Sequence, residues 1–500
     1  MRVAILQIRR MPATYFFDTL NVLYAGDLRR DGHEVKVYDH NLAEVDSLGA
    51  GLANLKQALD DFQPEVLLFE RVFSPALVAA LREESTIAVG ALHQESAEAI
   101  EGVDFSLPNL ARTPVVEAIN ALAEKGLDGL ANVPGLTFNG TTPDLGYRPS
   151  VDRLFVDFDL AYDLMIQTRP SPDPSPLRKH VFGNLGCPYR NAPNRTGFLD
   201  DIELPTNITA RGCTFCDRPD YDRIRPDFAL GLVREQLQQV RVAYPDLEQL
   251  ILVDEYALRY VDRFVALLLE EGVRDIEIFF SARIDYIHKF RDRFEAAVEQ
   301  AGGQLRLVMY LVGIENFSPM ELWRFNKGVS VRSAIEGLNI LKGIGDRQEH
   351  FRCEPSFGFI MFTPWTTPLD LYLNLAYIQR LDFDQWRQSA ILTRLRLYRE
   401  NALYFKALQE GLIDEDSHEG ADASARYGYE AEATWRFVDP RSRAIYEKVY
   451  NAPSGEAGLL ALQQALVPYK AEIESILQTV DLEDPDTVVK LATGDLAGAA

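Results

Sequence analysis

Residues 275–318 read DIEIFFSARIDYIHKFRDRFEAAVEQAGGQLRLVMYLVGIENFS. The run opens with an apolar strand pattern at 275–281 and continues with a helical pattern from 284 to about 301. A second apolar strand pattern follows at 305–312 (LRLVMYLV). Because parallel strands need a crossover connection of about this length, the stretch predicts a βαβ unit.

The same alternation of strand and helix patterns continues on both sides of this unit. The further elements that we expect are a strand at 249–253 (QLILV), a helix at 260–271, a helix at 331–341, a strand at 356–362 (SFGFIMF) and a helix that begins near Asp370. Repeated βα units of this spacing predict a full or partial βα barrel, similar to a TIM barrel, over residues 180–395.

Residues 1–145 also alternate short strands with helices. The expected strands are 2–8 (RVAILQI), 34–38 (EVKVY), 65–69 (EVLLF), 86–89 and 103–107, and the expected helices are 15–30, 75–84 and 114–125. Apolar strands separated by helices predict a parallel sheet covered on both faces, which is a doubly wound, Rossmann-like domain. Ligands of such sheets bind outside the carboxyl ends of the strands, here near 7–12, Asp39–His40 and 90–93.

Two further segments complete the predicted α/β organisation. Residues 146–179 form a linker, because 168–176 (TRPSPDPSP) has the stiff, exposed composition of a proline-rich connection. Residues 396–500 form a mostly helical, charged C-terminal region.

Composition narrows the class of protein. The chain has 500 residues, of which 47% are hydrophobic, so two or three globular domains are expected. Its net charge of −24 repels polyanions, and we therefore expect no nucleic-acid partner and no binding to anionic membranes. The N-terminus does not look like a cleavable leader, and no apolar run approaches the roughly 18 residues of a membrane span. The expected location is cytoplasmic.

The cysteines are few and clustered. Three of the four, Cys187, Cys213 and Cys216, fall within thirty residues, which predicts metal ligation in a reducing compartment. Three thiolates are the usual protein ligands of a [4Fe–4S] cluster that keeps one iron open. Cys353 lies just before an apolar strand pattern, and we expect it to be a small buried hydrophobe.

Two other uses of the CxxC at 213–216 remain open. A structural zinc site needs a fourth ligand, for which His180 is near in sequence and Cys353 is far. A thioredoxin-like redox pair would place the CxxC at the start of a helix, without a third thiol.

In its cysteines the chain resembles the radical S-adenosylmethionine superfamily, in the branch with an N-terminal cobalamin-binding domain. That superfamily usually has CxxxCxxC on the loop after the first barrel strand. Cys187–Arg190 (CPYR) resembles the first half and Cys213–Cys216 (CTFC) the second, and removing the 22 residues 191–212 would join them as CPYRCTFC. In a competing frame, 207–213 (NITARGC) resembles the strand that leads into this loop, and Cys213 would be the first ligand with a defective spacing.

Further segments resemble the family in the same order along most of residues 1–460. They are VDEY at 253–256, SARID at 281–285, GIENFS at 313–318, NKG at 326–328 and GFIMFTPWTT at 358–367.

The resemblance implies the cofactors and their ligands. Cys187, Cys213 and Cys216 would hold a [4Fe–4S] cluster that receives an electron from a reducing partner such as flavodoxin or ferredoxin. The open iron would chelate the amino and carboxylate groups of S-adenosylmethionine, whose cleavage gives a 5′-deoxyadenosyl radical. No residue is assigned as catalytic.

Contacts to S-adenosylmethionine follow from the same resemblance. Glu255 and Glu315 would face its amino group or ribose, and Arg283 would pair with its carboxylate. Ser318 would donate to the ribose or the carboxylate, and Phe215 would stack near the adenine. The alternative for the polar residues is a helix cap or a barrel salt bridge, and for Phe215 plain packing.

The first domain implies cobalamin less directly. Arg2–Ile8, the strand end at Asp39 and VPGL at 133–136 follow the family's layout. The chain has no DxHxxG, so no histidine ligand to cobalt is expected, and GALH at 90–93 matches the usual GGxH only in part. PNLAR at 108–112 stands where an acidic, glycine-containing segment is usual. The alternative is a sheet kept for packing or substrate docking.

The predicted reaction depends on cobalamin. If cobalamin binds, we expect methylation of an unactivated carbon or phosphorus centre in a small-molecule or peptide substrate. Otherwise rearrangement, ring closure or oxidation remains open, and so does a non-catalytic iron–sulfur or zinc protein. The C-terminal region is expected to shape the substrate pocket, with Tyr398, Arg399 and Trp435 as candidates. Trp365, just beyond the strand expected at 356–362, is a further pocket candidate, and the alternative for it is a core tryptophan.

Overall fold

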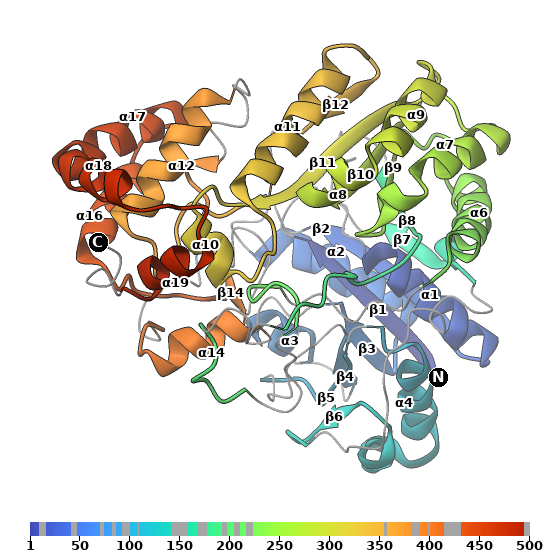
Figure 1. The fold of residues 1–500 in the computed structure, drawn as a ribbon. Helices are drawn as coiled ribbons and strands as arrows, with labels where there is room; N and C mark the ends of the chain where they lie inside the picture. Colours follow the sequence, from blue (N-terminus) through green and yellow to red (C-terminus); the bar gives the residue numbers. More distant parts are fainter. Residues whose placement is uncertain are drawn as a thin grey trace. The chain divides into compact units, whose positions relative to one another are not determined.

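The structure is a computed structural model of the 500-residue chain. It describes residues 1–9, 17–41, 48–70, 75–82, 87–92, 101–108, 110–141, 159–167, 178–192, 198–204, 211–216, 224–354, 358–381, 390–398, 401–414 and 432–494. By their internal contacts the residues divide into two compact units (Figure 1). Unit 1 comprises Met1–Leu185, Tyr221–Val253 and Ala421–Glu430, and unit 2 comprises Gly186–Asp220, Asp254–Gly420 and Ala431–Ala500. The domain limits proposed from the sequence stay predictions.

Unit 1 contains a seven-stranded sheet in the order β6-β5-β4-β3-β1-β2-β7. Its strands are β1 Arg2–Arg9, β2 Glu34–Asn41, β3 Val66–Phe69, β4 Ala88–Ala91, β5 Phe105–Ser106, β6 Thr137–Phe138 and β7 Met165–Gln167. Its helices are α1 Phe17–Arg30, α2 Leu48–Phe62, α3 Pro75–Arg82 and α4 Arg112–Lys125. The pairs are parallel apart from β5–β6, so the predicted doubly wound sheet is confirmed.

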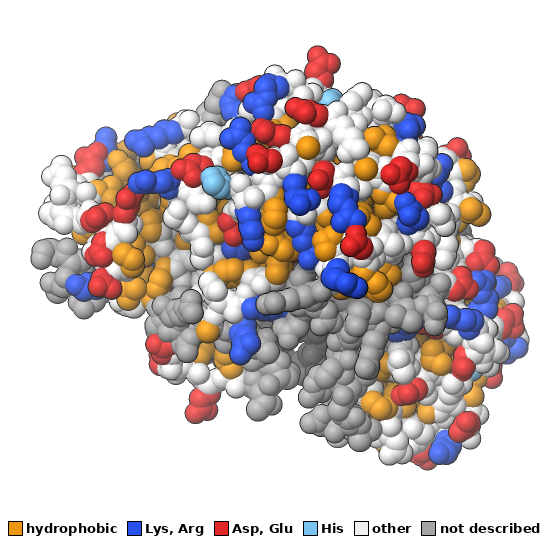
Figure 2. Space-filling model, turned by 45° about the vertical axis from the view of Figure 1, so that its right-hand side comes forward, with side chains coloured by type: hydrophobic (Ala, Val, Ile, Leu, Met, Phe, Trp, Pro, Cys, Tyr) orange, Lys and Arg blue, Asp and Glu red, His pale blue; other side chains and the backbone are white. Residues whose placement is uncertain are grey.

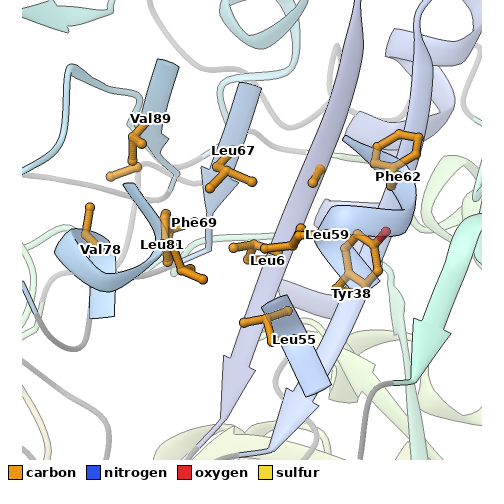
Figure 3. Packing of buried hydrophobic residues seen from close by; sticks show 12 residues of the cluster. Leu6, Tyr38, Leu55, Leu59, Phe62, Leu67, Phe69, Val78, Leu81 and Val89 are labelled. Atoms are coloured by element: carbon orange, nitrogen blue, oxygen red, sulfur yellow. The ribbon is translucent and has the colours of Figure 1, made fainter. Parts of the chain in front are cut away.

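Both faces of this sheet are covered. Figure 3 shows Leu6 and Leu67 on the strands packed with Leu55 of α2 and Val78 of α3. The side chain of Ile5 points to the opposite face and is 0% exposed, which shows that this face is buried as well. Burial on both faces explains why these strands read as continuous apolar runs.

The order in which strands are added to the sheet reverses at β1, although the strands stay parallel. From β1 the chain crosses to β2 on one side and later to β3 on the other, because β1 lies between them. In open parallel sheets, ligands bind outside the carboxyl ends of the strands at such a switch point, which in this sheet lies between β1 and β3.

Unit 1 also contains the first strands of the predicted barrel. They are β8 Arg178–Phe182 and β9 Gln249–Val253, which pair in parallel and are connected through helix α6 Pro226–Ala243. Gln236 of α6 fixes this helix to the strand, because its side-chain oxygen accepts from the Phe182 amide at 2.9 Å and its amide donates to the Phe182 carbonyl at 2.8 Å.

Unit 2 holds the βαβ unit predicted at 275–318. The parallel strands of unit 2 are β10 Glu277–Arg283, β11 Arg306–Glu315, β12 Phe351–Cys353 and β13 Gly358–Phe359, and β11 pairs with the other three. The helices around them are α7 Val261–Glu270, α8 Ile284–Lys289, α9 Arg291–Ala301, α10 Pro319–Arg324, α11 Val331–Gly345 and α12 Pro368–Arg380. The alternation of strand and helix is that of a βα barrel, present at least in part.

Three details differ from the sequence prediction. The helix expected from 284 to 301 is two helices that meet at Phe290, whose backbone (φ −115°, ψ 25°) leaves the helical region without a glycine or proline signal. The strand expected at 356–362 is limited to β13, among the described residues. Cys353 lies ahead of β13, as expected, but it is also the last residue of β12, a strand that was not predicted because FRC is too short and polar to show a strand pattern.

The C-terminal part of unit 2 is mostly helical, as expected. It contains α14 Ala402–Gln409, α16 Pro440–Tyr450, α17 Gly455–Leu466, α18 Lys470–Thr479 and α19 Pro485–Thr493, with a small antiparallel pair of β14 Leu397–Tyr398 and β15 Glu432–Ala433. Within the described ranges, no helix combines the length and apolar character that a membrane crossing requires.

Charged side chains of both signs are interspersed on the face of the molecule seen in Figure 2. Among the described surface pairs, Arg293 lies 3.3 Å from Asp262 and Arg291 lies 3.3 Å from Glu295. Exposed pairs of this kind contribute little to stability.

Candidate functional site

The candidate site lies in unit 2, at the carboxyl ends of β10 and β11. Arg283 is the last residue of β10 and stands beside Gly313 near the end of β11. Glu315 is the last residue of β11. The pairing of β11 with β13 shifts register between Gly313 and Glu315. Parallel strands deliver their carboxyl ends to one edge, where active sites of βα folds gather.

Arg283 is buried and contacts four residues of unit 2. Its Nη1 donates to Sγ of Cys213 at 3.3 Å, and its Nη2 donates to the Lys327 carbonyl at 2.7 Å. Its Nε donates to Asp285 at 3.0 Å, and its guanidinium lies 4.1 Å from the centre of the Tyr189 ring. Burial lowers the pKa of Arg283, but the neighbouring Cys213 and Asp285 outweigh that effect and raise it. Arg283 is therefore a cation held against the cysteine loop.

A second buried cation pairs with Glu315. The Nζ of Lys327 lies 2.7 Å from Oε1 of Glu315, and both side chains are at most 10% exposed. Burial lowers the pKa of Lys327, and the charges of Glu315 and Cys213 more than offset this and raise it. A Cβ at Gly313 would come within 2.8 Å of Oε1 of Glu315 and 2.9 Å of Nζ of Lys327, so a larger residue there would displace the charged ends of this pair. Glu315 itself has a left-handed backbone, with φ +70°.

The two halves of the split cysteine motif meet in space. The Gly212 amide donates to the Asn191 carbonyl at 3.0 Å, so the two ends of the 191–212 segment are hydrogen-bonded to each other. The side-chain amide of Asn326 donates to both the Asn191 carbonyl, at 3.0 Å, and the Gly212 carbonyl, at 2.7 Å. Cys187 and Cys213 are thus carried by chain segments that lie side by side.

The CxxC itself is a fixed turn. The Cys216 amide donates to the Cys213 carbonyl at 3.2 Å. Thr214 between them is buried, with its amide 3.0 Å from the Phe325 carbonyl and its hydroxyl 2.8 Å from the Arg324 carbonyl. Phe215 packs edge-on against the Phe325 ring, with 5.1 Å between the ring centres. This contact matches the packing alternative for Phe215, while the predicted contact to adenine stays a prediction.

Cys187 is half-buried and lies within electrostatic reach of the other predicted residues. Burial raises the pKa of the Cys187 thiol, the nearby Arg283 guanidinium opposes this rise, and Glu255 and Cys213 add to it. The four cysteines are free thiols, and burial raises the pKa of the Cys353 thiol to about 12. Cys353 is half-buried in β12, consistent with a packing role.

Glu255 follows a carboxylate that the sequence did not single out. Asp254 is 2% exposed and accepts from the Tyr260 hydroxyl at 2.6 Å and from the Tyr256 amide at 2.7 Å. Burial raises the pKa of Asp254 to about 6, although both hydrogen bonds oppose the rise. Glu255 next to it is half-buried.

Ser318 is fully buried, and its hydroxyl donates to Asp370 of α12. Its amide donates to the side-chain oxygen of Asn316 at 2.7 Å. The donor that the sequence prediction reserved for S-adenosylmethionine is therefore used within the fold, which favours the structural alternative for this residue.

A buried charged group beneath Ser318 was missed by sequence reasoning. Glu321 and Asp370 are 0% exposed, and Nη1 of Arg324 lies 3.2 Å and 3.6 Å from their respective carboxylates. Thr363 and Thr366 donate to Glu321 at 2.9 Å and 2.8 Å. Burial raises the pKa of Glu321, and the Arg324 charge opposes this. The only sequence signal was the spacing of charges at i and i+3 on one short helix, which is common.

The predicted pocket residues are in packed positions where the structure describes them. Trp365 is 8% exposed, and its indole donates to Glu410 at 2.6 Å. The indole of Trp435 donates to the Leu395 carbonyl at 2.9 Å, and Tyr398 lies in β14. Arg399 lies outside the described residues. A role in substrate binding stays a prediction for all four.

Unit 1 carries its own buried polar group at the switch point of the sheet. The side-chain amide of Asn21 in α1 donates to Gln7 near the end of β1 at 3.0 Å and to Glu70 after β3 at 3.2 Å. These three residues are at most 5% exposed, and Asp39 in β2 is 3% exposed. Of the ligand positions expected at 7–12 and 90–93, residues 10–12 and His93 lie outside the described residues.

The doubly wound sheet of unit 1 and the βα strands of unit 2 form the fold that the sequence resemblance predicted. The chain shares this fold with a solved cobalamin-dependent S-adenosylmethionine radical enzyme. The chain is similar to the cobalamin-dependent S-adenosylmethionine radical enzyme OxsB in its apo, selenomethionine-labelled form. That match has a TM-score of 0.61 and 13% identity, and covers 98% of this chain and 72% of the other.

A second structure of OxsB, with aqua-cobalamin and S-adenosylmethionine bound, matches with a TM-score of 0.56 and 12% identity, over 98% of this chain and 74% of the other. No family model and no curated protein matches the sequence. At these identities the comparison establishes the fold.

The donors present suit the cofactors of such a fold in kind. Cys187, Cys213 and Cys216 offer thiolates, and Arg283 and Lys327 bring positive charge to them. Among the described residues, no three Cys, His, Asp or Glu side chains are close enough together, as they stand, to hold a metal ion. The fit is therefore one of donor type and loop placement.

Proposed function

We propose that the chain is a radical S-adenosylmethionine enzyme whose Cys187, Cys213 and Cys216 hold a [4Fe–4S] cluster. The observation that carries this proposal is the meeting of the two cysteine-bearing segments beside Arg283, at the carboxyl edge of β10 and β11. When bound, the cluster supplies the electron that cleaves S-adenosylmethionine to methionine and a 5′-deoxyadenosyl radical.

The residues of the chain hold and orient these groups. Arg283 and Lys327 place two buried positive charges near the thiolates, which offsets the negative charge of a thiolate-ligated cluster. Among the described residues Arg283 uses three of its five N–H donors, and we propose that the other two bind the methionine carboxylate. Glu255 and Glu315 are the proposed acceptors for the ammonium or ribose of S-adenosylmethionine.

We further propose that unit 1 binds cobalamin at the carboxyl edge of β1 and β3, and that the reaction is methyl transfer to a small-molecule or peptide substrate. Support comes from the fold shared with OxsB and from the buried group Gln7, Asn21 and Glu70, whose polar atoms gather at the switch point. Flavodoxin or ferredoxin is the proposed reductant, and the cytoplasm the proposed location.

The test is anaerobic reconstitution with iron and sulfide, followed by reduction with S-adenosylmethionine present and assay of 5′-deoxyadenosine. The wild type is compared with a Cys213→Ala/Cys216→Ala variant and with Cys353→Ala as the matched control. We expect the double variant to lose the cluster and the product, and Cys353→Ala to keep both. Tight binding of one zinc ion in place of a cluster would refute the proposal.

Cobalamin is followed in the same preparations. Retention of cobalamin by the wild type, and its loss on Glu70→Leu, would support the proposed site in unit 1. Cleavage of S-adenosylmethionine without any cobalamin uptake would instead favour a radical rearrangement or oxidation.

A further inference from the structure

Asn326 lies where the two ends of the 191–212 segment meet. Its side-chain amide donates to the carbonyl at each end, at 3.0 Å to Asn191 and 2.7 Å to Gly212. The Gly212 amide also donates to the Asn191 carbonyl at 3.0 Å, so three hydrogen bonds close the segment at its base. One side chain on the loop after α10 thus contacts the residue that follows the first half of the cysteine motif and the residue that precedes the second half.

We propose that residues 191–212 are an insertion within a CxxxCxxC loop, and that Asn326 is the positioning residue that holds its two ends together. In an uninterrupted loop a peptide bond would join Arg190 to Cys213, and here the Asn326 side chain keeps the residues next to them close together. The inference rests on the proposed function in taking Cys187, Cys213 and Cys216 as ligands of one cluster.

The position of Asn326 is itself determined by the fold. It follows α10 in the left-handed region, with φ +48°, a conformation that asparagine tolerates better than most residues. Asn326 is 6% exposed, and its backbone amide donates to the Trp323 carbonyl at 2.9 Å. Its own carbonyl accepts from the Tyr189 hydroxyl at 2.7 Å. The side chain is therefore aimed at the loop ends rather than free to move.

Tyr189 extends the same contact network to the first half of the motif. Its hydroxyl accepts from the Asn191 side-chain amide at 3.0 Å, and its ring lies under the Arg283 guanidinium. A Cβ at Gly328 would come within 2.2 Å of the Tyr189 hydroxyl, and one at Gly212 within 2.7 Å of the Tyr189 carbonyl. Glycine at both places lets the chain approach Tyr189 this closely.

The described middle of the insertion packs into an apolar cluster that also contains Phe325 and Phe215. Phe198 and Leu199 are buried in an apolar cluster with Trp365 and Leu403, and Lys406 of α14 lies 2.8 Å from Asp201. These contacts hold the middle of the insertion against α14 and the cluster. Among the described residues, Asn191 and Gly212 are joined by the hydrogen bonds of the Gly212 amide and the Asn326 side chain.

The experiment combines two substitutions at Asn326 with two versions of the chain, one with and one without residues 191–212. Asn326→Asp keeps the shape and replaces the amide donor by an acceptor that faces two carbonyls. Asn326→Gly keeps the left-handed backbone and removes the side chain. Each is made in the full chain and in a chain from which residues 191–212 are excised, which reads CPYRCTFC. Asn451→Asp is the matched control, because its amide makes a similar bond, at 2.8 Å, to the Glu447 carbonyl on an exposed helix end.

Two quantities are measured for every variant. In the cluster-free protein under reducing, anaerobic conditions, dibromobimane bridges thiols that lie close together, and peptide mapping gives the yield of Cys187–Cys213 bridging. In the reconstituted protein, iron and sulfide per chain and the electron paramagnetic resonance signal of the reduced cluster are recorded. The bridging assay needs no cluster, so it tests Asn326 even if the proposed iron–sulfur function fails.

In the full chain we expect both Asn326 variants to lower bridging and cluster content by about tenfold, as the loss of buried hydrogen bonds predicts. In the excised chain the same substitutions should leave both quantities unchanged, and Asn451→Asp should be silent in either. Equal losses in the two loops, or no loss in the full chain, would overturn the proposal.

The excised chain lacks Phe198 and Leu199, and its folding is checked by circular dichroism. If it does not fold, amide hydrogen exchange of the full-length Asn326→Asp variant decides. Faster exchange confined to peptides that span 187–192 and 211–216 supports the proposal. Equal acceleration in α10 and α14 would mean that Asn326 stabilises the unit in general, and would overturn it.

Discussion

Arg283 donates from Nη1 to the sulfur of Cys213 across 3.3 Å, although 70 positions separate the two residues in sequence. The face of the same guanidinium lies 4.1 Å from the Tyr189 ring. One cation at the end of β10 therefore contacts residues from both halves of the split cysteine motif. A planar, always charged group is suited to this, because it can donate in its plane and stack on its face.

Replacement of Arg283 should destabilise the cluster-free protein. Arg283→Met leaves the Asp285 carboxylate and the cysteine thiols beside an apolar side chain, and we expect a loss of about 3 kcal/mol in the free energy of unfolding. Arg283→Lys keeps the positive charge but loses the planar guanidinium, so its unfolding free energy should lie between those of the wild type and Arg283→Met. Urea unfolding under reducing conditions measures both. Arg293→Met, at a 49% exposed side chain paired with Asp262, is the control and should cost less than about 1 kcal/mol. A loss no larger for Arg283→Met than for this control would contradict the prediction.

Asp254 should make stability depend on pH. Its folded-state pKa of about 6 is above the ordinary value of 3.8, so the folded chain binds the proton more tightly than the unfolded chain. Stability should therefore fall as the pH rises through this interval, and Asp254→Asn should remove that fall. We expect the difference in unfolding free energy between Asp254→Asn and wild type to rise by about 2 kcal/mol between roughly pH 4 and pH 7. Asp262→Asn, at a partly exposed pair, is the control, and parallel pH profiles for wild type and Asp254→Asn would refute the assignment.

Arg324 should be among the more sensitive positions of unit 2. Arg324→Met leaves the fully buried carboxylates of Glu321 and Asp370 without their cation, which should cost about 3–5 kcal/mol at neutral pH. The loss should shrink in acid, because a protonated carboxyl needs no cation. Arg332→Met removes a pair with Glu483 in which both side chains are at least 70% exposed, and should cost less than about 1 kcal/mol. Chemical unfolding at two pH values separates the cases, and equal losses for the two variants would count against the buried network.

Gly212→Ala tests the close approach of the two loop segments. Gly212 has φ +86°, and a Cβ would lie 2.7 Å from the Tyr189 carbonyl. Gly272 has φ +74° with nothing within 4 Å, so Gly272→Ala carries the backbone strain, about 1 kcal/mol, without the clash. We expect Gly212→Ala to be the more destabilised in urea and to lose several-fold in iron incorporation, while Gly272→Ala keeps its iron. Equal iron content in both would show that the approach of Tyr189 and Gly212 is not needed for the cysteine loop.

The alternation of strands and helices was predictable because it is local. A βαβ unit at 275–318 follows from apolar periodicity within a few residues, although β10 ends at Arg283, two residues beyond the strand predicted at 275–281. The break between α8 and α9 at Phe290 and the short strand that ends at Cys353 carry no such pattern, and they were missed.

The side-chain contacts of the site were predictable only in part. Short motifs singled out Arg283 and Glu315 because they follow strand ends, and those residues do lie at one edge of parallel strands. The same reasoning gave Ser318 a cofactor role, which stays a prediction, and it did not reveal that the Ser318 hydroxyl donates to Asp370, 52 positions away. A hydrogen bond over that separation leaves no trace in the local sequence.

The sequence by itself determined the order of the βα units, the doubly wound sheet at the start of the chain and the three clustered thiols, because periodicity and residue chemistry act over short distances. Only the tertiary structure decided that Cys187 and Cys213 belong to adjoining segments and that Asn326 joins their ends. That outcome depends on hydrogen bonds between residues more than a hundred positions apart, which form only once β11 and α10 have placed Asn326 beside the loop.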